Sequence, residues 1–350
     1  MAFDKITSMP YAGWIEPWDE RQIVLSTRLR LARNINGRPF PNRLTDAEAE
    51  AVAKEVIAAL PEDRQWHVLH MSELLQAEKG VLLEKHLASR ELLQQQAGRA
   101  LAVNDEQTLA VMINEEDHLR MQAILPGLQP EEGWRQISLL DDQLAARLDI
   151  AYDQRLGFLT ACPSNLGTGL RVSVMVHLPA LAMTGKLDAI FRRLPQAGLT
   201  VRGVYGEGSQ SQSGLYQISN QITLGHSEDD IIAQLRQLVE AIIAQEVQAR
   251  EWLRRNKGLQ LADAVGRAVG VLANAHLLAG REAMEQISLV RLGVAMGLCR
   301  RISYREVNLL MVSCRSALLQ ASAQKELTTE ERDALRADMA RKYFGGGDAV

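Results

Sequence analysis

Residues 109–120 read LAVMINEEDHLR, an apolar run of five residues followed closely by three consecutive acids, Glu115, Glu116 and Asp117. The apolar run is typical of a buried strand, and acids at the end of a strand can form a carboxylate site that accepts a proton. Arg120 follows closely enough to neutralise one acid or to reach a bound anion. An acidic turn exposed to solvent is the alternative interpretation of the same residues.

The segments before this stretch predict helices and one hairpin. Thr45 is a plausible N-cap, Glu48 stands three residues later and Pro61 ends the pattern, which predicts a helix over residues 45–60. Residues 74–96 predict a second helix. Two apolar runs joined by a turn at Asn104 and Asp105 predict a strand, a turn and a strand.

The segments after it divide the chain into two parts. A helix is predicted over 139–151, and strands over 155–160, 171–178, 199–205 and 215–224. Ser227 and Asp230 open a long amphipathic helix that is expected to end near residue 256. Residues 258–344 are helical almost throughout. We therefore expect an α+β protein of two domains, residues 1–257 with strands and helices and residues 258–350 with helices alone.

Composition excludes several classes of protein. The 350 residues are 47% hydrophobic and 23% charged with a net charge of -4, so a globular fold is expected and nucleic-acid binding would need a local basic patch. Three cysteines without metal spacing and the lack of an apolar leader predict a reduced, cytoplasmic protein. No apolar run approaches the roughly 20 residues of a membrane span.

Arginine dominates the basic residues, at 31 against 8 lysines. Its planar fork of donors suits carboxylates and phosphates, although a genome rich in G and C would produce the same bias. In residues 26–34, STRLRLARN, a strand would place Arg28 and Arg30 on one face, where they repel unless an anion lies between them. A solvated edge strand is the alternative.

Two further clusters combine glycine, arginine and a carboxylate. Residues 162–171, CPSNLGTGLR, form a Gly-rich loop that lets main-chain N–H groups approach a ligand, and Arg171 follows. Arg202 and Glu207 share the loop RGVYGEGS, for which a mobile surface loop is the alternative interpretation. The standard nucleotide-binding motifs are absent.

These clusters together resemble the motifs of the phosphagen (guanidino) kinase family. The stretches VLSTRLRLAR, LLEKHL, NEEDHLR, LGFLTACPSNLGTGLR and RGVYGEGSQSQSGLYQISNQITLG occur in the family's order and span most of residues 24–225. The resemblance implies an antiparallel β-sheet flanked by helices, followed here by the helical domain. Since the first arginine motif begins at residue 24, we expect no N-terminal substrate domain, and VRLGVAMGL and EERDALRA resemble the bacterial protein-arginine kinase branch, of the McsB type.

The resemblance also implies roles for single residues, with ATP as substrate and Mg²⁺ held mainly by its phosphates rather than by protein ligands. It implies Glu116 and Glu207 as catalytic carboxylates, Cys162 beside the guanidinium, and His86 as a nucleotide contact. Arg332 and Asp333 resemble a phosphoarginine-binding pocket, with an ordinary helical ion pair as the alternative. The phosphate-binding arginines would be Arg28, Arg30, Arg120, Arg171 and Arg202.

The chain departs from the family pattern at two positions. Met175 stands where the family has a second nucleotide-site histidine, although His177 lies two residues away on the same face. Gln217 replaces a family aspartate. The adenine contacts and the role of Gln217 therefore stay open.

The expected function is phosphorylation of arginine side chains in proteins by ATP. The resemblance suggests a heat-shock transcription repressor, a zinc-binding activator protein and a Clp-type AAA+ unfoldase as partners, a role in the stress response and in marking proteins for degradation, and a homodimer without direct nucleic-acid or membrane contact. A kinase of small guanidines and a catalytically dead adaptor that binds arginine or phosphoarginine proteins are the alternatives. The presence of both carboxylates and all five arginines disfavours the adaptor.

Overall fold

The computed structural model describes residues 6, 13–19, 21–94, 97–203, 213–323 and 325–344. Within these ranges the main sheet has eight strands in the order β2-β3-β4-β5-β1-β8-β10-β9, and β6 pairs with β7 separately. Helices accompany the sheet and fill the C-terminal part of the chain, which confirms the predicted α+β class. The strands are β1 (Val24–Arg33), β2 (Trp66–His70), β3 (Ala100–Asn104), β4 (Leu109–Ile113), β5 (Leu119–Pro126), β6 (Tyr152–Asp153), β7 (Gly157–Phe158), β8 (Leu170–His177), β9 (Leu199–Gly203) and β10 (Leu215–Asn220).

Strand β1 lies inside the sheet, between β5 and β8, so the edge-strand alternative is wrong. Its antiparallel register with β5 sets Arg28 opposite Ile124, Arg30 opposite Gln122 and Ala32 opposite Arg120. Residues that face each other across an antiparallel pair point to the same side of the sheet. Arg28, Arg30 and Arg120 therefore share one face, as the two-residue period of β1 predicted for the first two.

The chain forms two compact units, each described by itself. The first comprises Met1–Trp14, Ser26–Val174 and Ser219–Arg236, and the second Ile15–Leu25, Met175–Ile218 and Gln237–Val350. The helices of the first are α2 (Asp46–Ala59), α3 (Gln76–Glu84), α4 (Pro130–Ala145) and the start of α7.

The helix predicted from Thr45 and Glu48 is confirmed as α2, where the two residues form a capping box. The prediction for residues 74–96 is wrong after Glu84, because His86 has a left-handed backbone with φ 59° that ends the helix. The helix predicted over 139–151 instead begins at Pro130, since proline is tolerated in a first turn.

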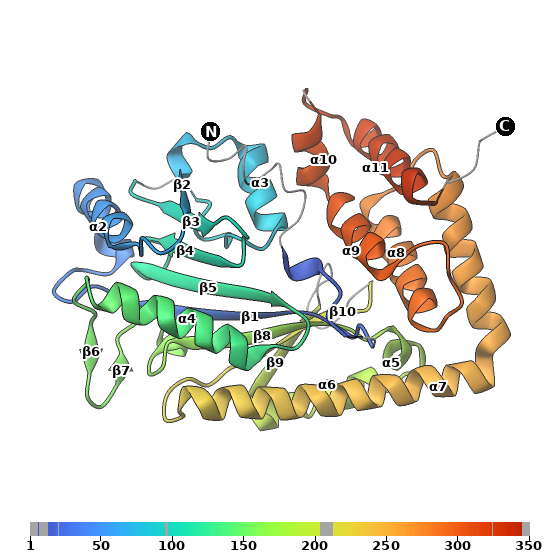
Figure 1. Cartoon of the computed structure of the whole chain (residues 1–350), viewed down its shortest axis with the longest axis horizontal. Helices are drawn as coiled ribbons and strands as arrows, with labels where there is room; N and C mark the ends of the chain where they lie inside the picture. The colour runs from blue at the N-terminus through green and yellow to red at the C-terminus, as the bar shows by residue number, and fades with distance from the viewer. Residues whose placement is uncertain are drawn as a thin grey trace. The chain divides into compact units, whose positions relative to one another are not determined.

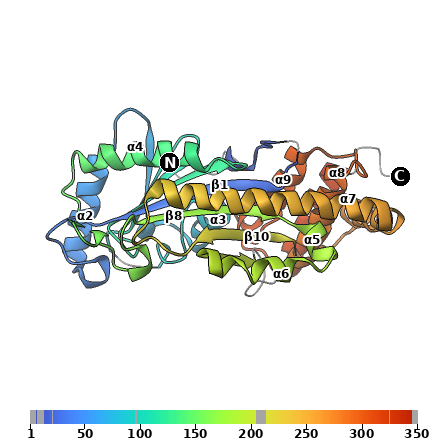
Figure 2. The same cartoon turned by 90° about the horizontal axis from the view of Figure 1, so that it is seen from below.

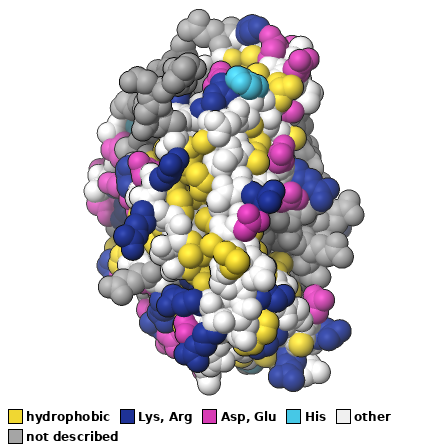
Figure 3. Space-filling view, turned by 90° about the vertical axis from the view of Figure 1, so that its right-hand side faces the viewer, with side chains coloured by type: hydrophobic (Ala, Val, Ile, Leu, Met, Phe, Trp, Pro, Cys, Tyr) yellow, Lys and Arg dark blue, Asp and Glu magenta, His cyan; other side chains and the backbone are white. Residues whose placement is uncertain are grey.

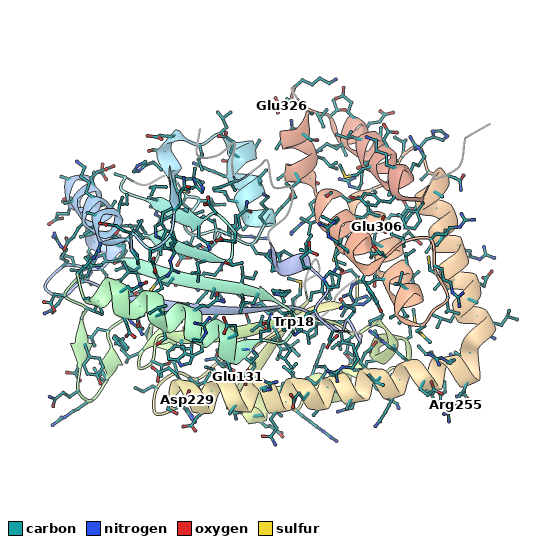
Figure 4. All side chains as sticks on the ribbon, in the orientation of Figure 1. Trp18, Glu131, Asp229, Arg255, Glu306 and Glu326 are labelled. Atoms are coloured by element: carbon teal, nitrogen blue, oxygen red, sulfur yellow. The ribbon has the colours of Figure 1, made fainter. Side chains whose placement is uncertain are left out.

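Helices cover both faces of the sheet in the first unit. On the arginine side, Leu82 of α3 packs with Leu101 of β3 and Met112 of β4 in a buried core. On the other side α4 crosses β1 and β5 so closely that a Cβ at Gly133 would lie 2.3 Å from Leu29 Cδ1. The start of α7 is tied to α4 by an ion pair between Arg236 and Glu131, the latter labelled in Figure 4.

The second unit is mostly helical. At the start of α7, which still belongs to the first unit, the predicted cap at Ser227 is confirmed, since Ser227 Oγ accepts from Asp230 N. The helix does not end near residue 256, but bends at Lys257, where φ is -138° and ψ is 27°, and continues to Asn274 (Figures 1 and 2). The domain boundary at residue 257 stays a prediction. The helices are α5 (Pro179–Met183), α6 (Leu187–Phe191), α7 (Glu228–Asn274), α8 (Gly280–Ala295), α9 (Tyr304–Ser313), α10 (Ser316–Ser322) and α11 (Thr329–Phe344).

No helix in the described part of the chain is both long enough and apolar enough to cross a bilayer.

Candidate active site

Four arginines of the first unit gather on one face of the sheet. Arg28 and Arg30 come from β1, Arg120 from β5 and Arg171 from β8. Burial, followed by the charges of Arg120 and Arg171, lowers the pKa of Arg28 to about 10. Burial and the same neighbours, together with Arg28, hold the pKa of Arg30 well below its ordinary value. The cluster is therefore a concentration of positive charge that an anion would relieve.

The acids after β4 have three different environments. Glu115 is buried and accepts from Arg120 Nη1 at 2.6 Å. Asp117 is also buried, and its Oδ1 accepts from Asn34 Nδ2 at 2.6 Å and from Ala161 N at 2.7 Å. Glu116 alone keeps 43% of its side-chain surface exposed, at 3.8 Å from Arg120 Nη1. The solvated acidic turn is thus wrong for Glu115 and Asp117, and Glu116 is the acid that a substrate can reach.

Arg120 influences the protonation of the acids after β4 and is itself influenced by them. Burial raises the pKa of Glu116, as do the neighbouring charges of Glu115 and Asp117, while Arg120 opposes them. For Arg120 itself, burial lowers the pKa, but the charge of Glu115 and the hydrogen bond to it outweigh burial and raise it. Arg120 therefore stays a cation at the junction between the arginines and the acids, and Glu116 is a stronger base than an ordinary glutamate.

A cavity of about 440 Å³ adjoins Glu116. It brings Glu116 together with Cys162, two residues for which the sequence predicted a common site. Its lining carries three carboxylates against one guanidinium, which suits a cationic ligand. The lining residues are Asn42, Glu91, Gln94, Arg99, Glu115, Glu116, Ala161, Cys162 and Pro163.

The loop that carries Cys162 is held by the buried acid next to Glu116. Asp117 accepts from Ala161 N, and Thr160 Oγ1 donates to Cys162 O at 2.8 Å. The Cys162 Sγ lies 3.1 Å from Ser164 Oγ, and the side chain is half-buried. Asp117 thus positions the cysteine, a link between two motifs that their separate patterns did not reveal.

His86 lies on the arginine side of the first unit. Gln122, which faces Arg30 across the sheet, donates through Nε2 to His86 O at 2.8 Å. The imidazole packs edge-on against Trp14, with ring centroids 5.3 Å apart. This places His86 near the cluster, and its contact with a nucleotide stays a prediction.

The last two expected residues, Arg202 and Glu207, come from one segment of the sequence. Arg202 lies exposed in β9. Glu207, the second expected catalytic carboxylate, lies outside the described residues. The structure therefore leaves the shared role of these two residues as a prediction.

His177 does not serve as the missing nucleotide histidine. It is fully buried in the second unit, where its Nε2 lies 2.8 Å from Ser288 Oγ and its Nδ1 lies 3.0 Å from Arg291 Nη1. Burial, followed by the charges of Arg291 and Arg250, holds the pKa of His177 well below its ordinary value. Both ring nitrogens are used within the protein, so the neutral imidazole is part of the core. Met175 is buried and Gln217 is half-buried in β10.

Arg332 and Asp333 are consecutive residues of α11, but their side chains have different partners. Arg332 Nη2 donates to Thr329 Oγ1 at 3.3 Å and the side chain is half-buried. Asp333 pairs with Arg336, a buried arginine that also donates to Cys314 O and Leu278 O at 2.7 Å each. The ion pair of the alternative interpretation exists, but with Arg336 rather than Arg332. Phosphoarginine binding here stays a prediction.

Sequence reasoning missed four residues of the cavity wall, Asn42, Glu91, Gln94 and Arg99. None belongs to a recognisable motif, so only their position after folding reveals them. Among the described residues, no group of three or more histidine, cysteine, aspartate and glutamate side chains is arranged to hold a metal ion.

Two protein families match successive parts of the chain. The family described as ATP:guanido phosphotransferase, C-terminal catalytic domain, matches residues 48–249. A second family, described as the protein-arginine kinase McsB C-terminal domain, matches residues 258–348.

Individual relatives cover nearly the whole chain. A protein-arginine kinase of Halothermothrix orenii is 46% identical over 92% of this chain and 93% of its own. One of Moorella thermoacetica is 43% identical over 95% and 97%.

Among solved structures, a lombricine kinase matches with a TM-score of 0.57 and 28% identity, over 71% of each chain. The duplicated taurocyamine kinase of Schistosoma mansoni, bound to transition state analog components, matches with a TM-score of 0.59 and 26% identity. That match covers 75% of this chain and 38% of the duplicated one.

Proposed function

Because the chain belongs to the ATP:guanido phosphotransferase family, we propose that it transfers the γ-phosphoryl group of ATP to the guanidinium of arginine residues in proteins. The relatives that cover nearly its full length are protein-arginine kinases, which supports the choice of acceptor. Three free cysteines favour the cytoplasm as the location.

One observation carries the proposal, the junction at Arg120. This arginine belongs to the positive cluster and also binds Glu115 in the wall of the acid-lined cavity. An anion and a cation would therefore bind side by side, as a triphosphate and a guanidinium must when a phosphoryl group passes between them.

The chemistry assigns a task to each side. A guanidinium is cationic at neutral pH and a poor nucleophile, so Glu116 would take one of its protons as the nitrogen attacks. A nitrogen–phosphorus bond forms, the bond from the γ-phosphorus to the β–γ bridging oxygen breaks, and ADP leaves with the electron pair. The arginines would neutralise the charge on the phosphoryl oxygens. Bound Mg²⁺ would add positive charge beside the phosphates, whose oxygens would supply most of its ligands.

We extend the proposal to assembly and partners. A homodimer is supported by an apolar surface on the second arm of α7, where Leu259 is 83% exposed and a groove of about 750 Å³ includes Val271 and Leu289. Figure 3 shows hydrophobic side chains along this side of the molecule with basic ones beside them. The division at residue 257 would separate a catalytic part from a helical part for dimerisation and phosphoarginine binding by Arg332 and Asp333.

The biological role would be in the stress response, with phosphoarginine marking proteins for a Clp-type AAA+ unfoldase. The heat-shock transcription repressor and the zinc-binding activator protein are proposed partners on the same ground, the resemblance to protein-arginine kinases. Nucleic acid and membrane are not proposed as direct ligands.

The test is to incubate the protein with ATP and an unfolded arginine-rich protein, and separately with free arginine at equal arginine concentration. Mass spectrometry under non-acidic conditions should locate phosphate on arginine residues of the protein. Phosphorylation of free arginine alone would favour the kinase of small guanidines. Binding without any turnover would favour the adaptor, and phosphate on Ser, Thr or Tyr would contradict both kinase assignments.

A further inference from the structure

The acid-lined cavity contains a carboxylate that the proposed reaction does not use. Glu91 lines the same cavity as Glu116 and Cys162 and is exposed to solvent. It follows α3 in a segment of turns, and its main-chain oxygen accepts from Nη1 of Arg99, which is 7% exposed. The buried arginine thus fixes the backbone of Glu91 at the wall of the cavity.

The three carboxylates of this wall are not equivalent. The charge of Glu115 is compensated by Arg120 at 2.6 Å, and Glu115 is buried. Glu116 is half-exposed and takes the reactive position. The charge of Glu91 acts on the same site, since it contributes to the raised pKa of Glu116 after burial and the nearer acids. Glu91 is therefore an exposed carboxylate of the cavity wall whose charge, opposed by the guanidinium of Arg99, acts on a substrate in the cavity.

A substrate arginine enters such a cavity with its guanidinium first. The guanidinium approaches Glu116, and the groups attached to the arginine main chain stay toward solvent, where Glu91 lies. We propose that Glu91 is a specificity-determining residue, which selects target arginines by the charge of the residues beside them. This inference rests on the proposed function. Lysine beside the target arginine would be favoured, and aspartate or glutamate would be disfavoured.

The size of the effect follows from Coulomb attraction. Two unit charges roughly 6 Å apart in water-like surroundings change a binding constant by about threefold. Glu91→Lys reverses the charge, so it should change the preference about tenfold, and Glu91→Gln should remove it. Both variants also remove a negative charge that acts on Glu116 and on the substrate guanidinium, so turnover of all three peptides should fall together, and only the ratio among the peptides measures selection.

The experiment uses three blocked peptides, each with one arginine flanked by alanine, lysine or aspartate. They compete in one reaction with ATP, and mass spectrometry measures the ratio of phosphorylated products. This ratio does not depend on how much enzyme is folded, so reduced stability of a variant cannot imitate the result. Glu62→Gln is the matched control, because Glu62 is an exposed acid of the same unit outside the cavity wall.

The unchanged protein and Glu62→Gln should prefer the peptides in the order lysine, alanine, aspartate. Glu91→Gln should give nearly equal products, and Glu91→Lys should reverse the order. If all four proteins gave the same ratio among the three products, the assignment of Glu91 would be overturned and the proposed function would stay intact. A failure of the unchanged protein to phosphorylate arginine in any peptide or protein would instead overturn the proposed function, and the inference with it.

Discussion

Strand β1 carries arginines on both of its faces, and the two faces use them differently. Arg33 is 1% exposed and its guanidinium is fully engaged: Asp141 of α4 accepts from it at 2.7 and 3.1 Å, and the main-chain oxygens of Ala32 and Thr168 accept at 2.9 and 3.0 Å. The ring of Phe158 lies 3.4 Å from it. This arginine has a permanent carboxylate partner and serves the fold.

Arg30, three residues earlier, faces the other side of the sheet. Its neighbours are Arg28, Arg120 and Arg171, and Glu115 is the acid that acts on it. Its Nε is buried and has no hydrogen-bond partner within the described part of the chain. We infer that an arginine of this strand is structural where the fold supplies its counter-charge, and open to an anionic ligand where the fold supplies other arginines instead.

The largest effect is expected from the acid beside the arginine cluster. Glu116→Gln removes the base and keeps the shape of the side chain, so turnover should fall by about 10²–10⁴-fold. Nucleotide binding and unfolding should change little, because the side chain is 43% exposed and makes no close ion pair. Single-turnover kinetics with an arginine-rich protein measures the loss. Near-normal turnover would show that another group accepts the proton.

The pH dependence sharpens the same prediction. A base acts only when deprotonated, and burial with the neighbouring acids raises the pKa of Glu116. The rate of the unchanged protein should therefore decline as pH falls through a value above that of an ordinary glutamate. A rate that stays constant down to the ordinary glutamate range would contradict this environment for Glu116.

The contrast between the two faces of β1 is tested by one pair of variants. Arg33→Gln removes a buried guanidinium and leaves the half-buried Asp141 without its partner, which should lower the free energy of unfolding by about 3–5 kcal/mol. Arg30→Gln should leave stability unchanged or slightly raised, because it removes repulsion among arginines. It should instead weaken nucleotide binding by about 1.5–3 kcal/mol, the contribution of a hydrogen bond to a charged group.

Urea unfolding and nucleotide titration on the same preparations separate the two outcomes. If Arg30→Gln unfolded as readily as Arg33→Gln, the arginine cluster would be structural. If Arg33→Gln lost nucleotide affinity at full stability, the division between the faces would be wrong.

The smallest effect concerns the cysteine on the cavity side. Cys162 is half-buried and lines the cavity, whereas Cys299 and Cys314 are buried at 7% and 3% exposure. Burial raises the pKa of the Cys314 thiol to about 12. Iodoacetamide should therefore modify Cys162 first in the folded protein, as peptide mapping over time would show. Equal modification rates of the three cysteines in the folded protein would contradict this prediction. Rates that become equal only after unfolding in urea would support it.

The sequence by itself determined whatever depends on neighbours along the chain. The capping box of Thr45 with Glu48 and the cap at Ser227 use hydrogen bonds over three residues, so spacing alone predicts them. The shared face of Arg28 and Arg30 follows from the two-residue period of a strand. The order of the motifs was enough to identify the family and the residue types of its site.

Only the tertiary structure decided which of these residues a substrate can reach. Glu115, Glu116 and Asp117 are equivalent acids in the sequence. They differ in the structure because Arg120 pairs with Glu115, and because Asn34 and Ala161 donate hydrogen bonds to Asp117. Glu116 is left exposed. Burial depends on such distant contacts, which no local pattern contains. The same reason places Glu91 at the cavity, and it makes His177, which the sequence left open as a nucleotide contact, a core residue held by Ser288 and Arg291.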